Sequence, residues 1–177
     1  MTGYQQAILY LSGSYCGDRF CVRNVDRWYV DQVADLFLTR PYLQRRSGEK
    51  RDYYVVKSCR WSRDVQLSDV VDVAGFCRGV VELQGTFALW CHRSHGEVKI
   101  KPRLRLYGTP ELLSFVASAI PAAPKKMQAV HTNIGSTSAL YYQSRAEIAD
   151  IFAYLDGDPR NAPLWDRWYE QLRGERS

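Results

Sequence analysis

Two short segments of the chain each contain a glycine and end in a side chain that could take part in phosphodiester chemistry. Gly13 superimposes on Gly79, and in that register Asp18 falls on Gln84. Paired carboxylates at such ends could hold a divalent metal ion, which stabilises the attacking and leaving oxygens and activates a water molecule. Only Asp18 is an acid, because Gln84 is neutral and a poor ligand for a hard cation. The pair therefore predicts weak metal binding at Asp18.

The clearest electrostatic feature is a basic segment at residues 98–106. Side chains alternate between the two faces of a strand, so its cations share one face and its apolar residues share the other. The cations are Lys99, Lys101, Arg103 and Arg105. Four like charges on one face repel one another, and a two-stranded basic ribbon fits the major groove of B-DNA. The alternative is a charged solvent face on an edge strand, which Pro102 would suit.

Smaller basic pairs occur in both halves of the chain. Arg45 and Arg46 precede a polar hairpin tip, and Lys125 and Lys126 stand at the corresponding place in the second half. Charged hairpin tips are common, but the repetition favours a shared role. A zinc site in the Cys-His-x-x-His segment at residues 91–95 is a weaker prediction, because a fourth ligand at normal spacing is missing.

The elements that must position these groups repeat along the chain. Small residues favour close packing between two helices predicted at 4–16 and 69–83. In the first half we expect a strand at 20–22, a helix over 28–38 capped by Asn24 or Asp26, and hairpin arms near 42–46 and 52–58. In the second half we expect strands near 86–92 and 98–107, a helix that is capped by Thr109 and runs to about Ile120, strands near 126–131 and 138–143, and helices at 145–155 and 162–173. The first half therefore keeps only a stub in place of the 86–107 hairpin.

Composition sets the broad class of the protein. The chain has 177 residues, 46% of them hydrophobic, which suits one folded domain or two small halves that share a core. A net charge of +5 permits a nucleic-acid partner without requiring one. Five cysteines without a Cys-x-x-Cys motif indicate reduced thiols. The N-terminus has no signal-peptide pattern, and no apolar stretch is long enough to span a bilayer, so we expect a cytoplasmic protein.

Taken together, residues 4–155 resemble the LAGLIDADG homing endonuclease family in its single-chain form with two repeats. The resemblance implies an α+β fold of two αββαββα repeats related by a pseudo-two-fold axis, the first shortened, divided here into residues 1–67 and 68–177. It also implies that the last acid of each motif binds Mg²⁺, a place that Asp18 and Gln84 occupy. Lys125 or Lys126, and Arg45 or Arg46, fall near the family's assisting base. The 86–107 hairpin corresponds to a hairpin that reads DNA.

The departures from the family pattern shape the predicted function. The second motif lacks its acid, and the first half lacks a full DNA-reading hairpin. We therefore expect a monomeric protein that binds double-stranded DNA with weak or lost cleavage, and that uses Mg²⁺ only if it is active. The alternatives are an active Mg²⁺-dependent endonuclease or nickase, and a domesticated transcription regulator or protein-interaction module of the same fold.

Overall fold

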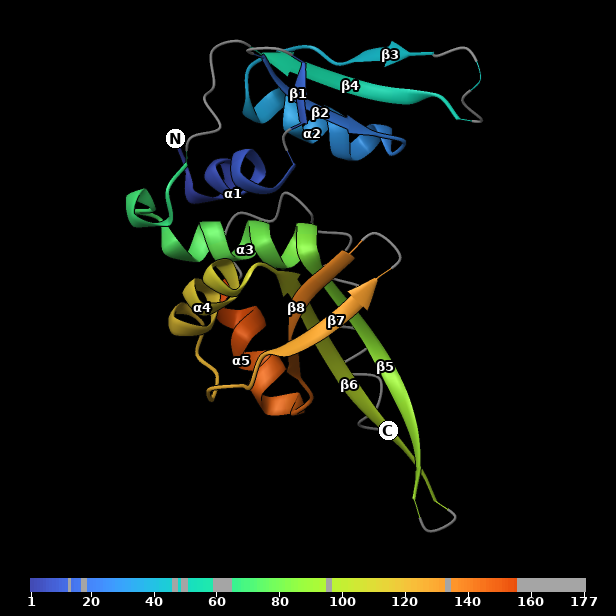
Figure 1. The fold of residues 1–177 in the computed structure, drawn as a ribbon, viewed down its shortest axis with the longest axis vertical. Coiled ribbons are helices and arrows are strands. Elements are labelled where there is room, and N and C mark those ends of the chain that lie inside the picture. The colour runs from blue at the N-terminus through green and yellow to red at the C-terminus, as the bar shows by residue number, and fades with distance from the viewer. Residues whose placement is uncertain are drawn as a thin grey trace.

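The computed structural model describes residues 1–12, 14–16, 19–45, 48, 51–58, 65–94, 97–132 and 135–155. Two helices, α1 (Gly3–Ser12) and α3 (Val73–Gln84), lie side by side in the middle of the molecule, with one sheet on each side of the pair (Figure 1). The remaining helices are α2 (Arg27–Leu36), the short 3₁₀ helix η1 (Leu67–Asp69), α4 (Pro110–Ala119) and α5 (Arg145–Leu155). None of the described helices is long and apolar enough to cross a membrane.

Each sheet has four antiparallel strands, and the two sheets differ mainly in one hairpin. The first sheet, sheet A, has the order β1 (Ser14–Cys16), β2 (Arg19–Asn24), β4 (Tyr53–Ser58) and β3 (Tyr42–Gln44). The second, sheet B, has the order β5 (Gly85–Ser94), β6 (Glu97–Gly108), β8 (Gly135–Tyr142) and β7 (Gln128–Thr132). The long β5–β6 hairpin projects from sheet B, whereas β1 has only three residues (Figure 1). The predicted α+β fold with a shortened first repeat is confirmed, and the division after residue 67 stays a prediction.

Close contact between α1 and α3 depends on small residues, as the sequence predicts. A Cβ added at Gly79 would lie 2.5 Å from the Cβ of Ala7, so only a glycine fits there without a shift of one helix. A Cβ at Gly3 would likewise overlap the backbone of Asp72 and Phe76. The two helices therefore approach each other through Ala7 and Gly79, which stand 72 positions apart.

The register of the repeat follows from these contacts and differs from the predicted one. With an offset of 72, Ser12 corresponds to Gln84, and each is the last residue of its helix. The predicted superposition of Gly13 on Gly79, with an offset of 66, is wrong, because Ala7 faces Gly79 and α1 ends at Ser12 before strand β1 begins. Asp18 lies outside the described residues, six positions beyond the residue that matches Gln84.

Pseudo-symmetry also relates the side chains beside this contact, although their chemistry differs. On one side, the hydroxyl of Tyr4 donates a hydrogen bond of 2.5 Å to Glu82. On the equivalent side, Phe76 packs edge-on against Tyr10, with ring centroids 6.0 Å apart. Glu82 also forms a buried ion pair with Arg78 at 3.0 Å, and Arg78 donates to the carbonyl oxygen of Leu155 at the end of α5. A polar contact therefore lies on one side of the helix pair, and an aromatic contact lies on the other.

One carboxylate serves the N-termini of both central helices. Asp72 caps α3 by accepting from the backbone N–H of Gly75 at 3.0 Å, and it accepts from the N–H of Gly3 in α1 at 2.9 Å. Two parallel helices bring their positive dipole ends together, and a shared anion offsets that repulsion. Asp72 therefore helps to hold the two helices parallel and in register.

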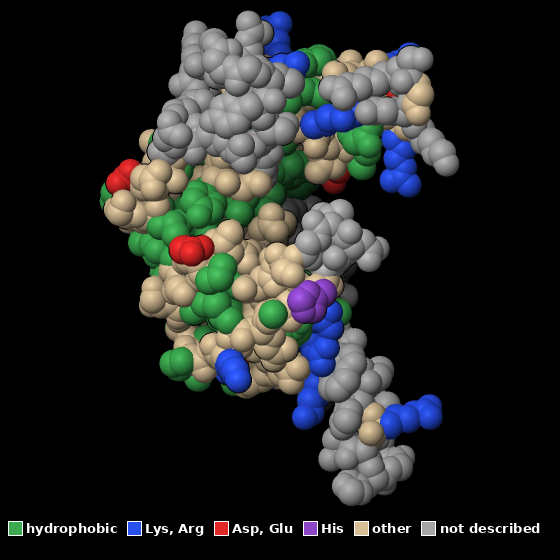
Figure 2. Space-filling model, viewed as in Figure 1, with side chains coloured by type: hydrophobic (Ala, Val, Ile, Leu, Met, Phe, Trp, Pro, Cys, Tyr) green, Lys and Arg blue, Asp and Glu red, His purple; other side chains and the backbone are tan. Residues whose placement is uncertain are grey.

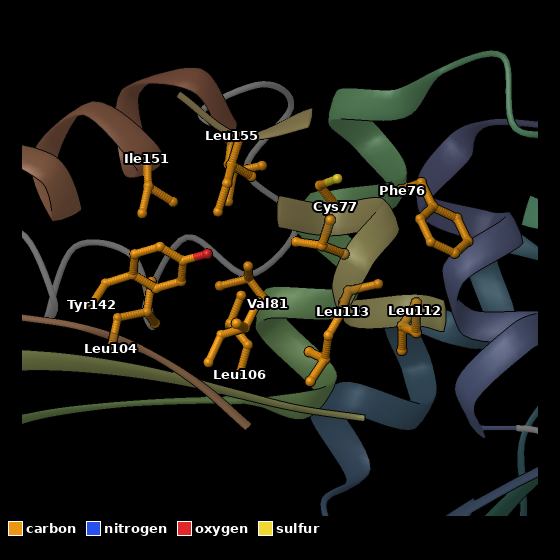
Figure 3. Close-up of a cluster of buried hydrophobic side chains, with 14 of the residues drawn as sticks. Phe76, Cys77, Val81, Leu104, Leu106, Leu112, Leu113, Tyr142, Ile151 and Leu155 are labelled. Carbon is orange, nitrogen blue, oxygen red and sulfur yellow. The ribbon is translucent and has the colours of Figure 1, made fainter. Parts of the chain in front are cut away.

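The helices also separate two hydrophobic cores. The larger core joins α3, α4 and α5 to the inner face of sheet B, and Figure 3 shows its side chains converging from these elements. Its labelled members are Phe76, Cys77, Val81, Leu104, Leu106, Leu112, Leu113, Tyr142, Ile151 and Leu155. The smaller core joins α1 and α2 to sheet A, around Phe20, Val33 and Val56. Each sheet thus has one face covered by helices, and we call the opposite face the open face.

Several predicted boundaries shift for local reasons. The second helix starts at Val73 with Asp72 as its cap, because the Ser68 region forms the separate turn η1. Helix α2 is capped by Asp26, and α4 is capped by Thr109, as predicted. Helix α2 ends at Leu36, well before Pro41. The last predicted helix, 162–173, lies outside the described residues.

Gly79→Ala is expected to lower the free energy of unfolding by about 1–3 kcal/mol, because the new methyl overpacks the helix contact. Better helix propensity, up to ~1 kcal/mol, offsets part of that loss. The swap Ala7→Gly with Gly79→Ala removes the overlap and is expected to recover most of the stability. Urea denaturation of the three proteins checks this, and a swap no more stable than Gly79→Ala would contradict the contact.

Alkaline pH is expected to destabilise the protein through buried acids. Burial and the neighbouring Glu82 carboxylate raise the pKa of Tyr4 well above its usual range, and burial raises the pKa of Cys77 to about 12. Above a pH of about 9 to 10 the unfolded chain loses these protons while the folded chain keeps them, so stability falls as pH rises. Tyr4→Phe should cost about 1–2 kcal/mol at pH 7 and flatten this fall above pH ~10. Thermal melts across pH 7–11 measure both effects, and a variant whose stability falls as steeply as that of the wild type would count against them.

Candidate functional site

The open face of sheet B carries the predicted basic side chains. Along β6, Leu104 and Leu106 are fully buried in the core, whereas Arg103 and Arg105 are half-buried on the opposite face and Lys101 is exposed. The predicted alternation of β6 is therefore confirmed for these residues, and the side chain of Lys99 lies outside the described residues. Figure 2 shows Lys and Arg side chains gathered along the lower right of the molecule, over sheet B.

Neighbouring groups hold the two arginines from one side and leave room on the other. With its amide turned to suit both groups, Gln143, directly after β8, accepts from Arg103 Nε and Nη2 at 3.3 Å. The guanidinium of Arg105 lies 5.5 Å from the ring centroid of Tyr141 on β8. On β5, the residues paired with these arginines are Ala88 and Thr86, which are small and exposed. The two arginines are thus contacted from the β8 side, and the side chains beside them on β5 are small.

A hollow of about 290 Å³ opens on this face between β6, β7 and β8. Its lining is polar and rich in hydrogen-bond donors, and consists of Arg103, Arg105, Gln128, Tyr141 and Gln143. Such a surface suits a flat, anionic ligand with hydrogen-bond acceptors on its edge.

Pro102 lies in a part of β6 that is an edge strand, as the sequence suggests. Strand β8 pairs with β6 only from Leu104 to Gly108, so Pro102 lies where β6 has β5 on one side and no pairing with β8 on the other. A proline there removes no bond of the β6–β8 ladder. The basic strand is therefore central near α3 and an edge strand farther out.

Two cations on the open face of sheet A lie near aromatic rings, as Arg105 does on sheet B. The guanidinium of Arg23 lies 3.6 Å from the ring centroid of Tyr53, and Lys57 lies 5.7 Å from that of Tyr42. Arg45, a predicted DNA-binding residue, forms an exposed ion pair with Asp52 at 3.2 Å. Its predicted partner Arg46 lies outside the described residues. Among the described side chains, the open face of sheet A thus presents Arg23 and Lys57, and that of sheet B presents Lys101, Arg103 and Arg105.

The ends of the central helices are the predicted metal site, and the residues there do not fit a metal ion. Gln84 ends α3, and the matching last residue of α1 is Ser12, so neither position carries a carboxylate. The nearby acid Glu82 is buried and already bonded to Tyr4 and Arg78. In the part of the chain that the structure describes, no group of three or more His, Cys, Asp or Glu side chains could hold a metal ion. The role of Asp18 as a metal ligand stays a prediction, and the corrected register removes its main argument.

The predicted assisting base Lys125 lies on the helix side of sheet B. Lys125 forms an ion pair of 2.7 Å with Glu147 of α5, and its ammonium lies 5.7 Å from the ring centroid of the core residue Tyr142. Arg103 and Arg105 occupy the other face of the sheet. Lys126 is exposed. The proposed catalytic roles of both lysines stay predictions, and the ion pair gives Lys125 a structural role.

Sequence reasoning missed the residues that support the arginines. Tyr141 and Gln143 alternate with the buried Leu140 and Tyr142 along the chain, so the same period of two that identified the basic strand would have placed them on the open face. Gln128 had no comparable signal, because it begins a strand after a loop. The predicted zinc motif at residues 91–95 has side chains outside the described set.

Comparison with solved structures identifies the fold. No family model and no curated protein matches the chain. A point mutant of the endonuclease I-SmaMI matches with a TM-score of 0.68 and 8% identity, over 97% of this chain and 90% of the other. I-SmaMI bound to an uncleaved DNA target with calcium ions matches with a TM-score of 0.63 and 8% identity, over 99% and 93%. The LAGLIDADG homing endonuclease I-LtrWI, bound to target DNA, matches with a TM-score of 0.66 and 8% identity, over 98% and 90%. The chain therefore has the fold of single-chain LAGLIDADG homing endonucleases.

Removing the ion pair at Lys125 is expected to affect stability. Lys125→Met leaves Glu147 without this cation and should lower the free energy of unfolding by about 1 kcal/mol. The matched change Lys126→Met alters an exposed side chain and should stay within about 0.5 kcal/mol of the wild type. Urea denaturation compares the two variants, and equal effects would show that the ion pair contributes nothing.

Proposed function

We propose that the protein is a monomer that binds double-stranded DNA with the open faces of its two sheets and does not cleave it. The observation that carries the proposal is the pair of neutral residues, Ser12 and Gln84, at the matching ends of α1 and α3. In the family that the fold resembles, these ends carry the acids that bind metal at the scissile phosphates.

Binding is supported by the charge and shape of sheet B. Lys101, Arg103 and Arg105 lie on one open face beside a polar hollow, and the β5–β6 hairpin extends that face away from the centre. Basic side chains that neutralise DNA phosphates release condensed counterions, which gives affinity that falls with salt. The solved structures of I-SmaMI and I-LtrWI with this fold hold DNA targets, which favours the same partner here.

We expect no cleavage because the ends of α1 and α3 lack the carboxylates that would bind metal ions. Hydrolysis through metal ions needs carboxylate oxygens that bind the ions and hold them beside the phosphate. A serine hydroxyl and a glutamine amide carry no charge and bind Mg²⁺ poorly. The protein would then keep the recognition surface of an endonuclease without its chemistry, and Mg²⁺ would be dispensable for binding.

The test measures binding and cleavage separately. Wild-type protein should bind duplex DNA with an affinity that falls as salt rises, and it should leave supercoiled plasmid intact with Mg²⁺ or Mn²⁺. Changing Lys99, Lys101, Arg103 and Arg105 to Ala should weaken binding and lower the salt slope by roughly 0.9 for each phosphate that the variant no longer neutralises. Changing Arg27 to Ala, on the outer surface of α2, serves as the control.

Two results would overturn the proposal. Duplex binding that is absent, or unaffected by the four substitutions in a folded variant, would favour a protein-interaction module. Metal-dependent cleavage by the wild type would favour the active endonuclease. Loss of that cleavage in Asp18→Asn would identify Asp18 as a ligand of the metal ion. The double change Ser12→Asp with Gln84→Glu should increase Mg²⁺ binding, whereas Asp18→Asn should not change it.

A further inference from the structure

We propose that β6 reads two guanines that lie two base pairs apart on the same DNA strand, through Arg103 and Arg105. The inference rests on the proposed function, because it assumes that the open face of sheet B enters the major groove. It goes further by stating which bases the sheet selects and at what spacing.

The spacing comes from strand geometry. Residues on one face of an antiparallel strand recur every two positions, or about 6.8 Å. The base pairs of B-DNA rise about 3.4 Å each, so two steps of DNA match one repeat of the strand face. Because this rise is measured along the helix axis, Arg103 and Arg105 are in register with alternate base pairs when the 103–105 segment of β6 lies parallel to the DNA axis within the groove. Lys101, one repeat farther out, is in register with the next alternate pair.

The choice of guanine comes from the arginine side chains. A guanidinium can donate two hydrogen bonds to the O6 and N7 acceptors of guanine, an arrangement that a lysine cannot reproduce as a fork. This works only if the guanidinium is held at a fixed angle. Gln143 holds Arg103 through two bonds of 3.3 Å, and the ring of Tyr141 supports Arg105 at 5.5 Å.

Access to the bases comes from β5. The residues across from Arg105 and Arg103 are Thr86 and Ala88, whose short, exposed side chains leave space beside the two half-buried arginines. Larger side chains at these two positions would stand between the arginines and a base edge. The hollow beside them, lined also by Gln128, gives space for the base-pair edge to approach the sheet.

Sheet A lacks an equivalent pair among its described residues. Its open-face cations are Arg23, which lies on Tyr53 at 3.6 Å, and Lys57, which lies near Tyr42. Cys21 and Val55, on the same face between them, are almost fully buried. The selected target is therefore expected to be lopsided, with its defined guanines on the side bound by sheet B.

The test selects bound sequences from a duplex library with a random core, using the full chain. Wild-type protein should enrich two guanines with one base between them. Arg105→Lys keeps the charge but loses the fork, so it should remove the preference at one guanine by about 5- to 150-fold and leave the salt slope unchanged. Arg103→Lys should do the same at the other guanine, two positions away. Arg27→Lys is the matched control and should leave the selected site as in wild type.

The outcomes separate the two proposals. Absence of duplex binding at low salt contradicts the proposed function itself. Duplex binding that enriches no guanine pair at this spacing, or that keeps the pair in both lysine variants, leaves the proposed function standing and overturns the inference. A lowered salt slope with an unchanged site in these variants would show that the arginines contact phosphates, which also overturns it.

Discussion

The close approach of α1 and α3 at Ala7 and Gly79 determines how the rest of the structure is arranged. Each sheet is attached to the C-terminal end of one of these helices, β1 after α1 and β5 after α3. The distance and angle between the helices therefore set the distance and angle between the sheets. Since Gly79 cannot take a methyl group without a shift, the sheets are held by backbone packing, and Asp72 fixes the helices at their N-terminal ends.

Cations lie close together on the open face of each sheet, and their mutual repulsion must be offset. On sheet B, Tyr141 and Gln143 contact Arg105 and Arg103 from the β8 side and offset part of the repulsion. On sheet A, Arg23 lies 3.6 Å from the ring centroid of Tyr53, closer than Arg105 lies to that of Tyr141 on sheet B. The same backbone plan thus presents cations on the open faces of both sheets.

The sequence predicted features that depend on a short repeat and failed where partners are distant. The alternation of Arg103, Leu104, Arg105 and Leu106 has a period of two, so the strand and its faces followed directly. The cap at Thr109 is equally local. The register of the repeat was ambiguous, because Gly13 can be matched with Gly79 or with Gly85, and only the contact of Ala7 with Gly79 decides between them. The bond from Tyr4 to Glu82 joins residues 78 positions apart, and no local pattern indicates it.

The two contacts beside Ala7 and Gly79 differ in chemistry, and this difference determines which helix can pair with which. Two copies of α3 brought together in the same way would place Phe76 opposite Glu82, and the buried carboxylate would lose the phenol that it bonds here. Two copies of α1 would place Tyr4 opposite Tyr10, with no carboxylate to accept the hydrogen bond from the Tyr4 hydroxyl. Only the mixed pair is complementary. Each of the two helices is therefore matched to the other and not to a second copy of itself.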